Sequence, residues 1–311
     1  MAELRHIPVM LEEAVEGLAV QAGGRYLDGT FGRGGHARAV LSRLGPDGRL
    51  LLMDRDPQAV AEARKSFAAE PRVAIRHDNF SGMAEWDETA EGLDGVLLDL
   101  GVSSPQLDEA ARGFSFMADA PLDMRMDTSR GESAADFLAH ATEREIADVL
   151  WQFGEERFSR KIAHAIVERR AENPVTRTGE LAALIERVVG RREPGKHPAT
   201  RSFQALRIRV NGELDAVRRG LDAALSRLKP GGRLAVISFH SLEDRIVKQF
   251  IRDHGGRVVG SRRGPPVVAA PAELVAVGKA QFPSDAELTA NPRARSAVLR
   301  VAEKLPLAEG A

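Results

Sequence analysis

The sequence predicts an α/β domain built on a doubly wound, mostly parallel sheet, with a helical insertion after the fourth strand. Short apolar runs alternate with helical patterns over roughly the first 100 residues, as is typical of such sheets. A loop with four glycines, residues 29–35, joins the first apolar run to the start of a helix. The alternation stops near residue 104 and resumes near residue 212, which indicates that the segment between is inserted.

Strands of a parallel sheet are covered on both faces, so they are expected as short apolar runs. The expected strands are residues 26–27, 49–54, 73–75, 94–100, 233–239 and 297–302. Helical spacing of apolar residues predicts helices at 8–17, 35–44, 57–68, 213–228 and 242–253. Turns are expected at 45–48 and 229–232, and a long surface loop rich in Pro, Gly and Ala at 260–292.

The segment between residues 104 and 211 shows helical patterns and loops, and no strand is expected there. Its expected helices are residues 133–138, 143–151, 157–170 and 178–189. We therefore expect one domain formed by residues 1–105 and 212–311. Residues 106–211 are expected to form a helical insertion domain that binds the substrate.

Composition excludes several classes of chemistry. The chain has 311 residues, a formal net charge of −1 and no cysteine. It therefore has no disulfide, no Cys-ligated zinc or iron–sulfur site and no thiol nucleophile. No signal peptide or membrane-spanning apolar run is found, so we expect a soluble, cytoplasmic protein.

Acidic residues stand at or near the ends of the first, second and fourth expected strands: Asp28, Asp54 and Asp99. Ligands of open α/β sheets bind at the carboxyl ends of the strands. Asp54, after the second strand, suits the hydroxyls of a ribose, which NAD and S-adenosylmethionine share. Asp28 would repel a pyrophosphate, so acidic strand ends suit the cationic S-adenosylmethionine better. A helix N-cap or a solvated strand end is the simpler alternative for each acid.

Two polar segments follow later strands. Ser103 and Ser104, with Pro105 and Gln106, leave the fourth strand. Acceptors here suit a nucleobase amine, whose hydrogens must be held to turn its nitrogen toward a methyl donor, although a plain Ser-Pro turn is the alternative. His240 follows the fifth strand, and we expect it to face the substrate.

The residues after His240 allow two further interpretations. Ser241 is expected to cap the next helix, with Asp244 at the third helical position. His240 with Glu243 or Asp244 has the spacing of a metal pair, but no third ligand is evident, so no metal site is predicted.

A local basic segment interrupts an otherwise acidic chain. Residues 157–209 hold thirteen Lys or Arg residues and five acids. Most of these arginines are explained by solvated helix faces, but the run 196–204 and the loop 291–296 suggest contacts with a phosphate backbone. The residues expected to bind RNA are Lys196, His197, Arg201, Arg293 and Arg295.

The whole pattern closely resembles the MraW/RsmH family of small-subunit ribosomal RNA cytosine-N4 methyltransferases. The resemblance extends from about residue 6 to residue 302. It is carried by residues 28–36, 99–106, 112–116, 121–126, 154–157, 196–204, 237–245 and 291–296.

The resemblance implies a class I (Rossmann-like) methyltransferase sheet and S-adenosylmethionine as cofactor. It implies methylation of the N4 amine of a decoding-centre cytidine in 16S rRNA, on free RNA or in the assembled small subunit, and leaves a homodimer open. The implied cofactor contacts are Gly34, Gly35, His36, Asp54, Phe80, Asp99 and Gln106. Phe80, as an adenine-stacking group, and Gln106 rest on the resemblance alone.

The absence of cysteine agrees with methylation at N4, because methylation at cytosine C5 needs a thiol nucleophile. N4 transfer needs no covalent intermediate, so the protein contributes mainly positioning. The proton leaves to a nearby acceptor or to water, and Asp99, Ser103 and His240 are the candidate catalytic residues for accepting it.

Three other functions fit part of the pattern. An NAD-dependent oxidoreductase explains the glycine loop and Asp54 but not the basic insertion. A ribosome-assembly factor would keep this fold without catalysing a reaction. An amino-methyltransferase acting on DNA or another nucleic acid has the same charge pattern.

Overall fold

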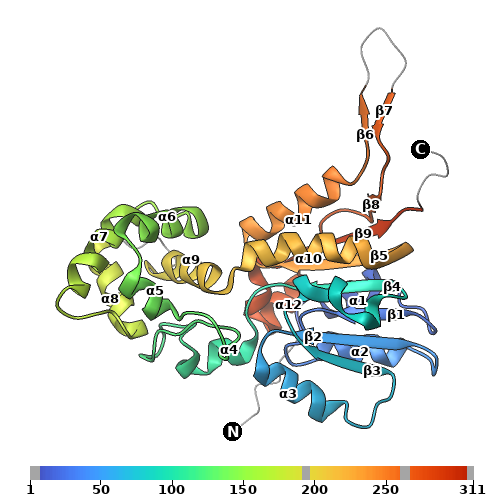
Figure 1. Ribbon diagram of the computed structural model, residues 1–311, viewed down its shortest axis with the longest axis horizontal. Coiled ribbons are helices and arrows are strands. Elements are labelled where there is room, and N and C mark those ends of the chain that lie inside the picture. Colours follow the sequence, from blue (N-terminus) through green and yellow to red (C-terminus); the bar gives the residue numbers. More distant parts are fainter. Residues whose placement is uncertain (1–7, 191–196, 260–266, 307–311) are drawn as a thin grey trace. The chain divides into compact units, whose positions relative to one another are not determined.

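The computed structural model describes residues 8–190, 197–259 and 267–306. The chain divides into two compact units (Figure 1). The first consists of residues 1–101 and 214–311, and the second of residues 102–213. Each unit has its own apolar core.

The first unit is built on a seven-stranded sheet with the order β3-β2-β1-β4-β5-β9-β8. β1 to β5 are parallel, whereas β9 runs antiparallel to both of its neighbours. The predicted class I (Rossmann-like) sheet is therefore confirmed. The strands are β1 (Arg25–Asp28), β2 (Arg49–Asp54), β3 (Val73–His77), β4 (Leu93–Asp99), β5 (Leu228–Ser238), β8 (Leu274–Ala276) and β9 (Val298–Lys304).

Alternation along the strands creates two apolar faces, because successive side chains point to opposite sides of a sheet. Tyr26 packs in one core and its neighbour Leu27 in the other. The first core includes residues of α1 (Leu11–Gly17), α2 (Gly35–Arg43) and α3 (Pro57–Ser66). The second includes residues of the 3₁₀ helix η1 (Phe80–Glu85), α10 (Glu213–Arg227) and α11 (Ser241–Asp253).

The remaining elements of this unit are short. They are η2 (Asp87–Thr89), the hairpin strands β6 (Arg257–Val259) and β7 (Val267–Ala270), α12 (Asp285–Ala290) and η4 (Pro292–Ser296). No helix among the described residues has both the length and the apolar character needed to cross a membrane.

The second unit is helical. Its core is formed mainly by α6, α7, α8 and α9, and α6 packs against both α7 and α9. Within residues 102–190 and 197–213 no strand is formed, apart from one isolated bridge between Pro121 and Arg177. Its elements are α4 (Ser104–Asp108), η3 (Ala110–Arg112), α5 (Ala134–His140), α6 (Glu143–Gly154), α7 (Ser159–Arg170), α8 (Thr178–Val189) and α9 (Thr200–Asn211).

Two expectations about local structure are wrong. Residues 229–232 are not a separate turn, because β5 begins at Leu228 and its register with β4 shifts across them. Residues 267–292 are not a loop, since they contain β7, β8 and α12, and β8 pairs with β9 at the sheet edge. Residues 260–266 of that expected loop lie outside the described part of the chain.

Candidate functional site

Asp28, Asp54 and Asp99 are the last residues of β1, β2 and β4. These strands are parallel and adjacent, so the three carboxylates lie at one edge of the sheet. Backbone hydrogen bonds fix the loop after β1 to its neighbours, from Gly29 N–H to Leu97 and from Phe31 N–H to Met53. We call this end of the first unit the acidic edge.

The glycine loop follows the shape that its residues impose. Gly34 is the N-cap of α2 and has φ 73°, a left-handed conformation that suits glycine. A Cβ there would lie 2.4 Å from the Phe31 ring, and one on Gly35 would lie 2.0 Å from Pro8. Phe31 and Pro8 therefore pack closely against the loop backbone. Helix α2 begins at the acidic edge, where its first amide groups have no intrahelical acceptor.

Asp54 binds the loop directly. Its Oδ2 accepts the backbone N–H of Gly32 at 2.8 Å, and its Oδ1 accepts that of Asp56 at 2.8 Å. An ionised carboxylate offers about four acceptor positions, so capacity remains for the hydroxyls of a ligand. Asp54 thus holds the two loops at the ends of β1 and β2 together.

Burial raises the pKa of all three aspartates. The pKa of Asp28 rises to about 7, mainly because it is desolvated, although the Thr30 backbone N–H opposes this shift. Desolvation likewise raises the pKa of Asp54 to about 6. The pKa of Asp99 is raised well above its usual value by desolvation and then by the nearby charges of Asp28 and Glu243. A cation at this edge would favour the ionised forms.

Asp99 has a buried side-chain oxygen, Oδ1, for which the described residues provide no hydrogen-bond partner. Its backbone N–H donates to Thr30 Oγ1 at 2.7 Å, which ties the end of β4 to the glycine loop. His36 lies beside it in α2, with Nδ1 3.8 Å from Asp99 Oδ2. The other ring nitrogen of His36 is 3.1 Å from the Val9 carbonyl oxygen, so this buried side chain is held from both sides.

Phe80 begins η1 after β3 and is mostly buried. Its ring lies against Gly220 of α10, where a Cβ would come within 2.4 Å of two ring carbons. Its Cβ lies against Gly29 of the glycine loop, at 2.8 Å from the position of a Cβ on that residue. Two glycines therefore make the space that Phe80 occupies.

His240 is the N-cap of α11, and this corrects the expected cap. Its Nδ1 accepts the backbone N–H of Glu243 at 3.4 Å, while Glu243 Oε2 accepts that of Phe239 at 2.9 Å. Glu243 Oε1 also lies 3.2 Å from His240 Nε2. Asp244, expected in the cap, instead forms a paired interaction with Arg300 of β9 at 2.6 and 3.0 Å.

The sequence comparisons with known proteins agree with one another. The profile of the MraW methylase family matches residues 3–305. The ribosomal RNA small subunit methyltransferase H of Stenotrophomonas maltophilia (strain K279a) is 62% identical, over 96% of this chain and 93% of that protein. The protein of the same name from Xanthomonas axonopodis pv. citri (strain 306) is 60% identical, over 98% of this chain and 89% of that protein.

The chain belongs to the MraW methylase family. Among solved structures, an rRNA methylase from Streptococcus thermophilus aligns with a TM-score of 0.44 and 11% identity, over 96% of this chain and 99% of that chain. This structural likeness is weak, and the sequence matches alone carry the assignment.

As a member of the MraW methylase family with this fold, the chain is an S-adenosylmethionine-dependent methyltransferase. The cofactor supplies an electrophilic methyl group on a positively charged sulfur. The acidic edge fits such a cation, because it gathers the buried carboxylate of Asp28, the partly buried carboxylates of Asp54 and Asp99, and an unpartnered Asp99 oxygen in the described structure. Gly34, Gly35, His36 and Phe80 lie at the same edge, in the loops and helix that follow β1 and β3.

Ser103 and Gln106 belong to the second unit of this MraW methylase. Gln106 Oε1 accepts the backbone N–H of Ser103 at 3.0 Å, which closes the first turn of α4. Gln106 is only 4% exposed. Both residues therefore shape this turn, and their expected roles in catalysis and cofactor binding stay predictions.

The residues expected to bind RNA lie in both units. His197 packs its ring against Phe116, with centroids 4.5 Å apart, and Arg201 is partly buried in α9. Arg293 and Arg295 are exposed on η4. Lys196 lies outside the described residues. Their contacts with RNA stay predictions.

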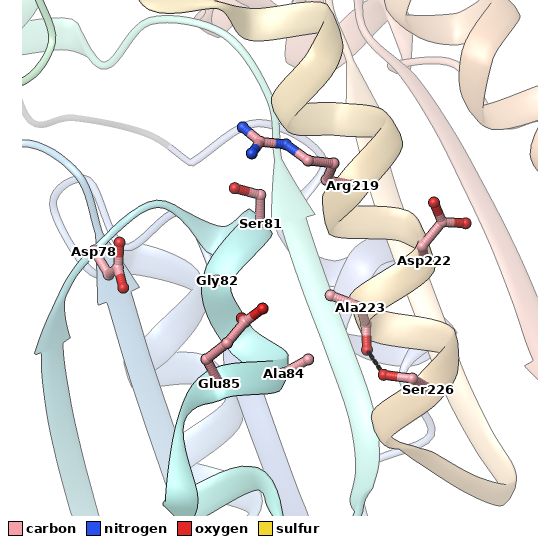
Figure 2. Close-up of a pocket in the computed structure, with 9 residues that line it drawn as sticks. All are labelled: Asp78, Ser81, Gly82, Ala84, Glu85, Arg219, Asp222, Ala223 and Ser226. Carbon is pink, nitrogen blue, oxygen red and sulfur yellow. Dashed lines mark hydrogen bonds between the residues drawn. The ribbon is translucent and has the colours of Figure 1, made fainter.

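An open cavity of about 460 Å³ lies between η1 and α10 (Figure 2). None of its nine lining residues is a predicted site residue of the family, although η1 also carries Phe80. They are Asp78, Ser81, Gly82, Ala84, Glu85, Arg219, Asp222, Ala223 and Ser226. The cavity borders the acidic edge, because Asp78 directly follows β3 and its backbone N–H donates to the Asp54 carbonyl oxygen at 3.0 Å.

Three residues have positioning roles at the site that the sequence does not predict. Thr30 binds the end of β4, Glu243 supports His240, and Gly220 makes room for Phe80. The resembling runs 28–36 and 237–245 contain the first two. No local pattern indicates the partner of Thr30, and the spacing of His240 and Glu243 suggests only a metal pair. Gly220 lies inside an ordinary helical pattern, where its packing role has no sequence signal.

Proposed function

We propose that this chain methylates the N4 amine of a cytidine in small-subunit ribosomal RNA. The observation that carries the proposal is the unpartnered Oδ1 of Asp99, buried at the acidic edge of the described structure. The names of the relatives, which are small-subunit rRNA methyltransferases, support the choice of RNA. The resemblance of the sequence supports a decoding-centre cytidine as the target.

Asp99 suits the amine because an exocyclic amine is a weak nucleophile whose lone pair is delocalised into the ring. A carboxylate that accepts one N–H hydrogen bond turns the nitrogen and then holds the proton it releases. Its raised pKa makes Asp99 a better proton acceptor than an ordinary aspartate. His240 and Ser103 are the alternative acceptors in this proposal.

The helical insertion and η4 would hold the RNA. Thirteen basic residues between 157 and 209, and the exposed Arg293 and Arg295, suit a phosphate backbone. The target base has to leave its stack to reach the acidic edge, which is easiest in a single-stranded region. Catalysis then rests mainly on positioning.

The test is transfer of a radiolabelled methyl group from S-adenosylmethionine to purified small subunits that lack the modification, followed by nucleoside analysis. Label in N4-methylcytidine is expected, and Asp99→Ala and Asp99→Asn should both lower kcat by at least about 100-fold. Asp47→Ala, which removes an exposed acid from the turn before β2, should leave transfer unchanged. A parallel assay on protein-free 16S rRNA decides between free RNA and the assembled subunit.

Label in a different nucleoside would contradict the proposed target. No label on either substrate, despite cofactor binding, would favour an assembly factor without catalysis. A normal rate in Asp99→Asn would remove Asp99 from the chemistry.

A further inference from the structure

Phe282 is an unusual surface residue, because 67% of it is exposed. The residue before it, Gln281, exchanges two backbone hydrogen bonds with Leu299 of β9, at 2.9 and 3.0 Å. β9 begins at Val298, which pairs with Ser238 at the end of β5. Phe282 therefore lies at the same end of the sheet as the acidic edge.

The backbone on both sides of Phe282 is firmly held. Ser284 caps α12 by accepting the Glu287 N–H at 3.2 Å, and Glu287 Oε1 accepts the Met10 N–H at 2.7 Å. Ala294 of η4 is fully buried in the core. An aromatic ring on such a fixed segment loses little conformational entropy when it binds a partner.

The charges around this segment favour RNA. Arg293 and Arg295 are exposed on η4, which directly follows α12. The exposed acid nearest to Phe282 in sequence is Asp285. The Glu287 carboxylate accepts a hydrogen bond from the Met10 N–H. Aromatic rings beside basic side chains are a usual platform for single-stranded nucleic acid, whose bases stack on the ring while cations bind phosphates.

We propose that Phe282 stacks on an unpaired ribosomal RNA base close to the target cytidine, with Arg293 and Arg295 on neighbouring phosphates. The inference rests on the proposed function and names a positioning residue for it. Phe282 acts on RNA binding and does not touch the cofactor.

Four variants test this assignment in the methyl-transfer assay on purified, unmodified small subunits. Phe282→Ala and Phe282→Leu should each raise KM about tenfold, which lies within the range for losing one base–aromatic stack. Phe282→Trp should stay near the wild-type KM. Val275→Ala, at another exposed apolar residue of the same unit, should change nothing. All four should keep the wild-type kcat and the wild-type Kd for S-adenosylmethionine.

The leucine variant separates stacking from a general apolar contact. A wild-type KM for Phe282→Leu would overturn the inference, as would a wild-type KM for Phe282→Ala. Each result is meaningful only beside wild-type transfer, so a wild-type enzyme that transfers nothing would overturn the proposed function and this inference together.

A photo-crosslinking amino acid at position 282 identifies the partner. Benzoylphenylalanine placed there should crosslink to 16S rRNA in the small subunit, and the same group at position 275 should not. A crosslink from position 282 to a ribosomal protein, or to a second copy of the chain, would replace RNA by a protein partner and overturn the inference.

Discussion

The backbone N–H of Gly32 donates to Asp54 Oδ2 over 2.8 Å. This bond joins the glycine loop to the end of β2, while the second oxygen of Asp54 binds the N–H of Asp56. Asp54, which the sequence predicts to bind a ribose, therefore also shapes the loop. The two roles are compatible because each carboxylate oxygen has a second lone pair.

The first prediction separates these roles of Asp54. Asp54→Ala leaves two amides without their acceptor and should lower the free energy of unfolding by about 1–3 kcal/mol. It should also weaken S-adenosylmethionine binding at least about tenfold. Asp56→Ala removes the N-cap of α3 and should cost about 1 kcal/mol with cofactor affinity unchanged. Thermal unfolding and calorimetric titration measure both effects, and equal cofactor affinities in the two variants would contradict a direct role.

The second prediction concerns pH. The pKa of Asp28 is about 7 and that of Asp54 about 6 in the folded, cofactor-free protein, against a usual value of 3.8. The folded state thus holds more protons than the unfolded state between pH 4 and 7. Stability should therefore fall as pH rises through this window. Denaturant unfolding of the cofactor-free protein between pH 4.5 and 8 measures this slope. A free energy of unfolding that stays constant or rises with pH would contradict the raised pKa values of Asp28 and Asp54.

Cofactor binding should show the opposite trend. A cation prefers the ionised carboxylates, so affinity for S-adenosylmethionine should rise between pH 5 and 8, with protons released on binding near pH 6.5. S-adenosylhomocysteine lacks the sulfonium charge and should show a smaller rise. Asp28→Asn should reduce the slope. Calorimetry in two buffers of different ionisation enthalpy counts the protons, and no release would show that Asp28 and Asp54 are ionised before binding.

Local patterns predict the elements that depend on neighbouring residues. The apolar run 49–54 forms β2 with the expected bounds, because a buried parallel strand needs only that run. Helix α8 also has the expected bounds, with Glu180 at its first turn and Gly190 in a left-handed conformation after its end. The strand-end acids follow from the same alternation, which places all three at one edge.

Features that depend on distant partners are not predicted. β8 has three residues in a segment rich in Pro, Gly and Ala, and it is a strand because β9 supplies its hydrogen bonds. Residues 229–232 have the composition of a turn, yet they belong to β5, where its pairing with β4 is irregular. Helix α9 (Thr200–Asn211) is not among the expected helices, although it lies in the segment expected to be helical. At the site, His240 and Glu243 are three residues apart. Many residue pairs with this spacing on a helix make no contact, so the spacing alone does not predict that these two side chains interact.

The third prediction separates the capping role of His240 from a catalytic one. His240→Ala removes the N-cap of α11 and should cost about 1 kcal/mol of stability. Asn is a good N-cap, so His240→Asn should restore most of that loss. If His240 also faces the substrate, as the sequence predicts, kcat should stay low in both variants. Normal turnover in His240→Asn would confine this residue to capping.

The fourth prediction tests the position of the Phe80 ring through a substitution at Gly220, which lies against it. Alanine usually stabilises a helix relative to glycine by about 1 kcal/mol. Here the added methyl would lie 2.4 Å from the Phe80 ring, so Gly220→Ala should instead destabilise the protein by about 1–3 kcal/mol. The displaced ring should also weaken S-adenosylmethionine binding if Phe80 carries the adenine.

Phe80→Leu provides the matching half of this test. The smaller side chain relieves the clash with Ala at position 220. The double variant Gly220→Ala/Phe80→Leu should therefore be more stable than the sum of the two single-variant losses of stability predicts. It should nevertheless bind the cofactor as weakly as Phe80→Leu alone, because leucine cannot stack on a purine as an aromatic ring does. Recovery of cofactor affinity together with stability would mean that Phe80 supports the site only by filling the space between Gly29 and Gly220.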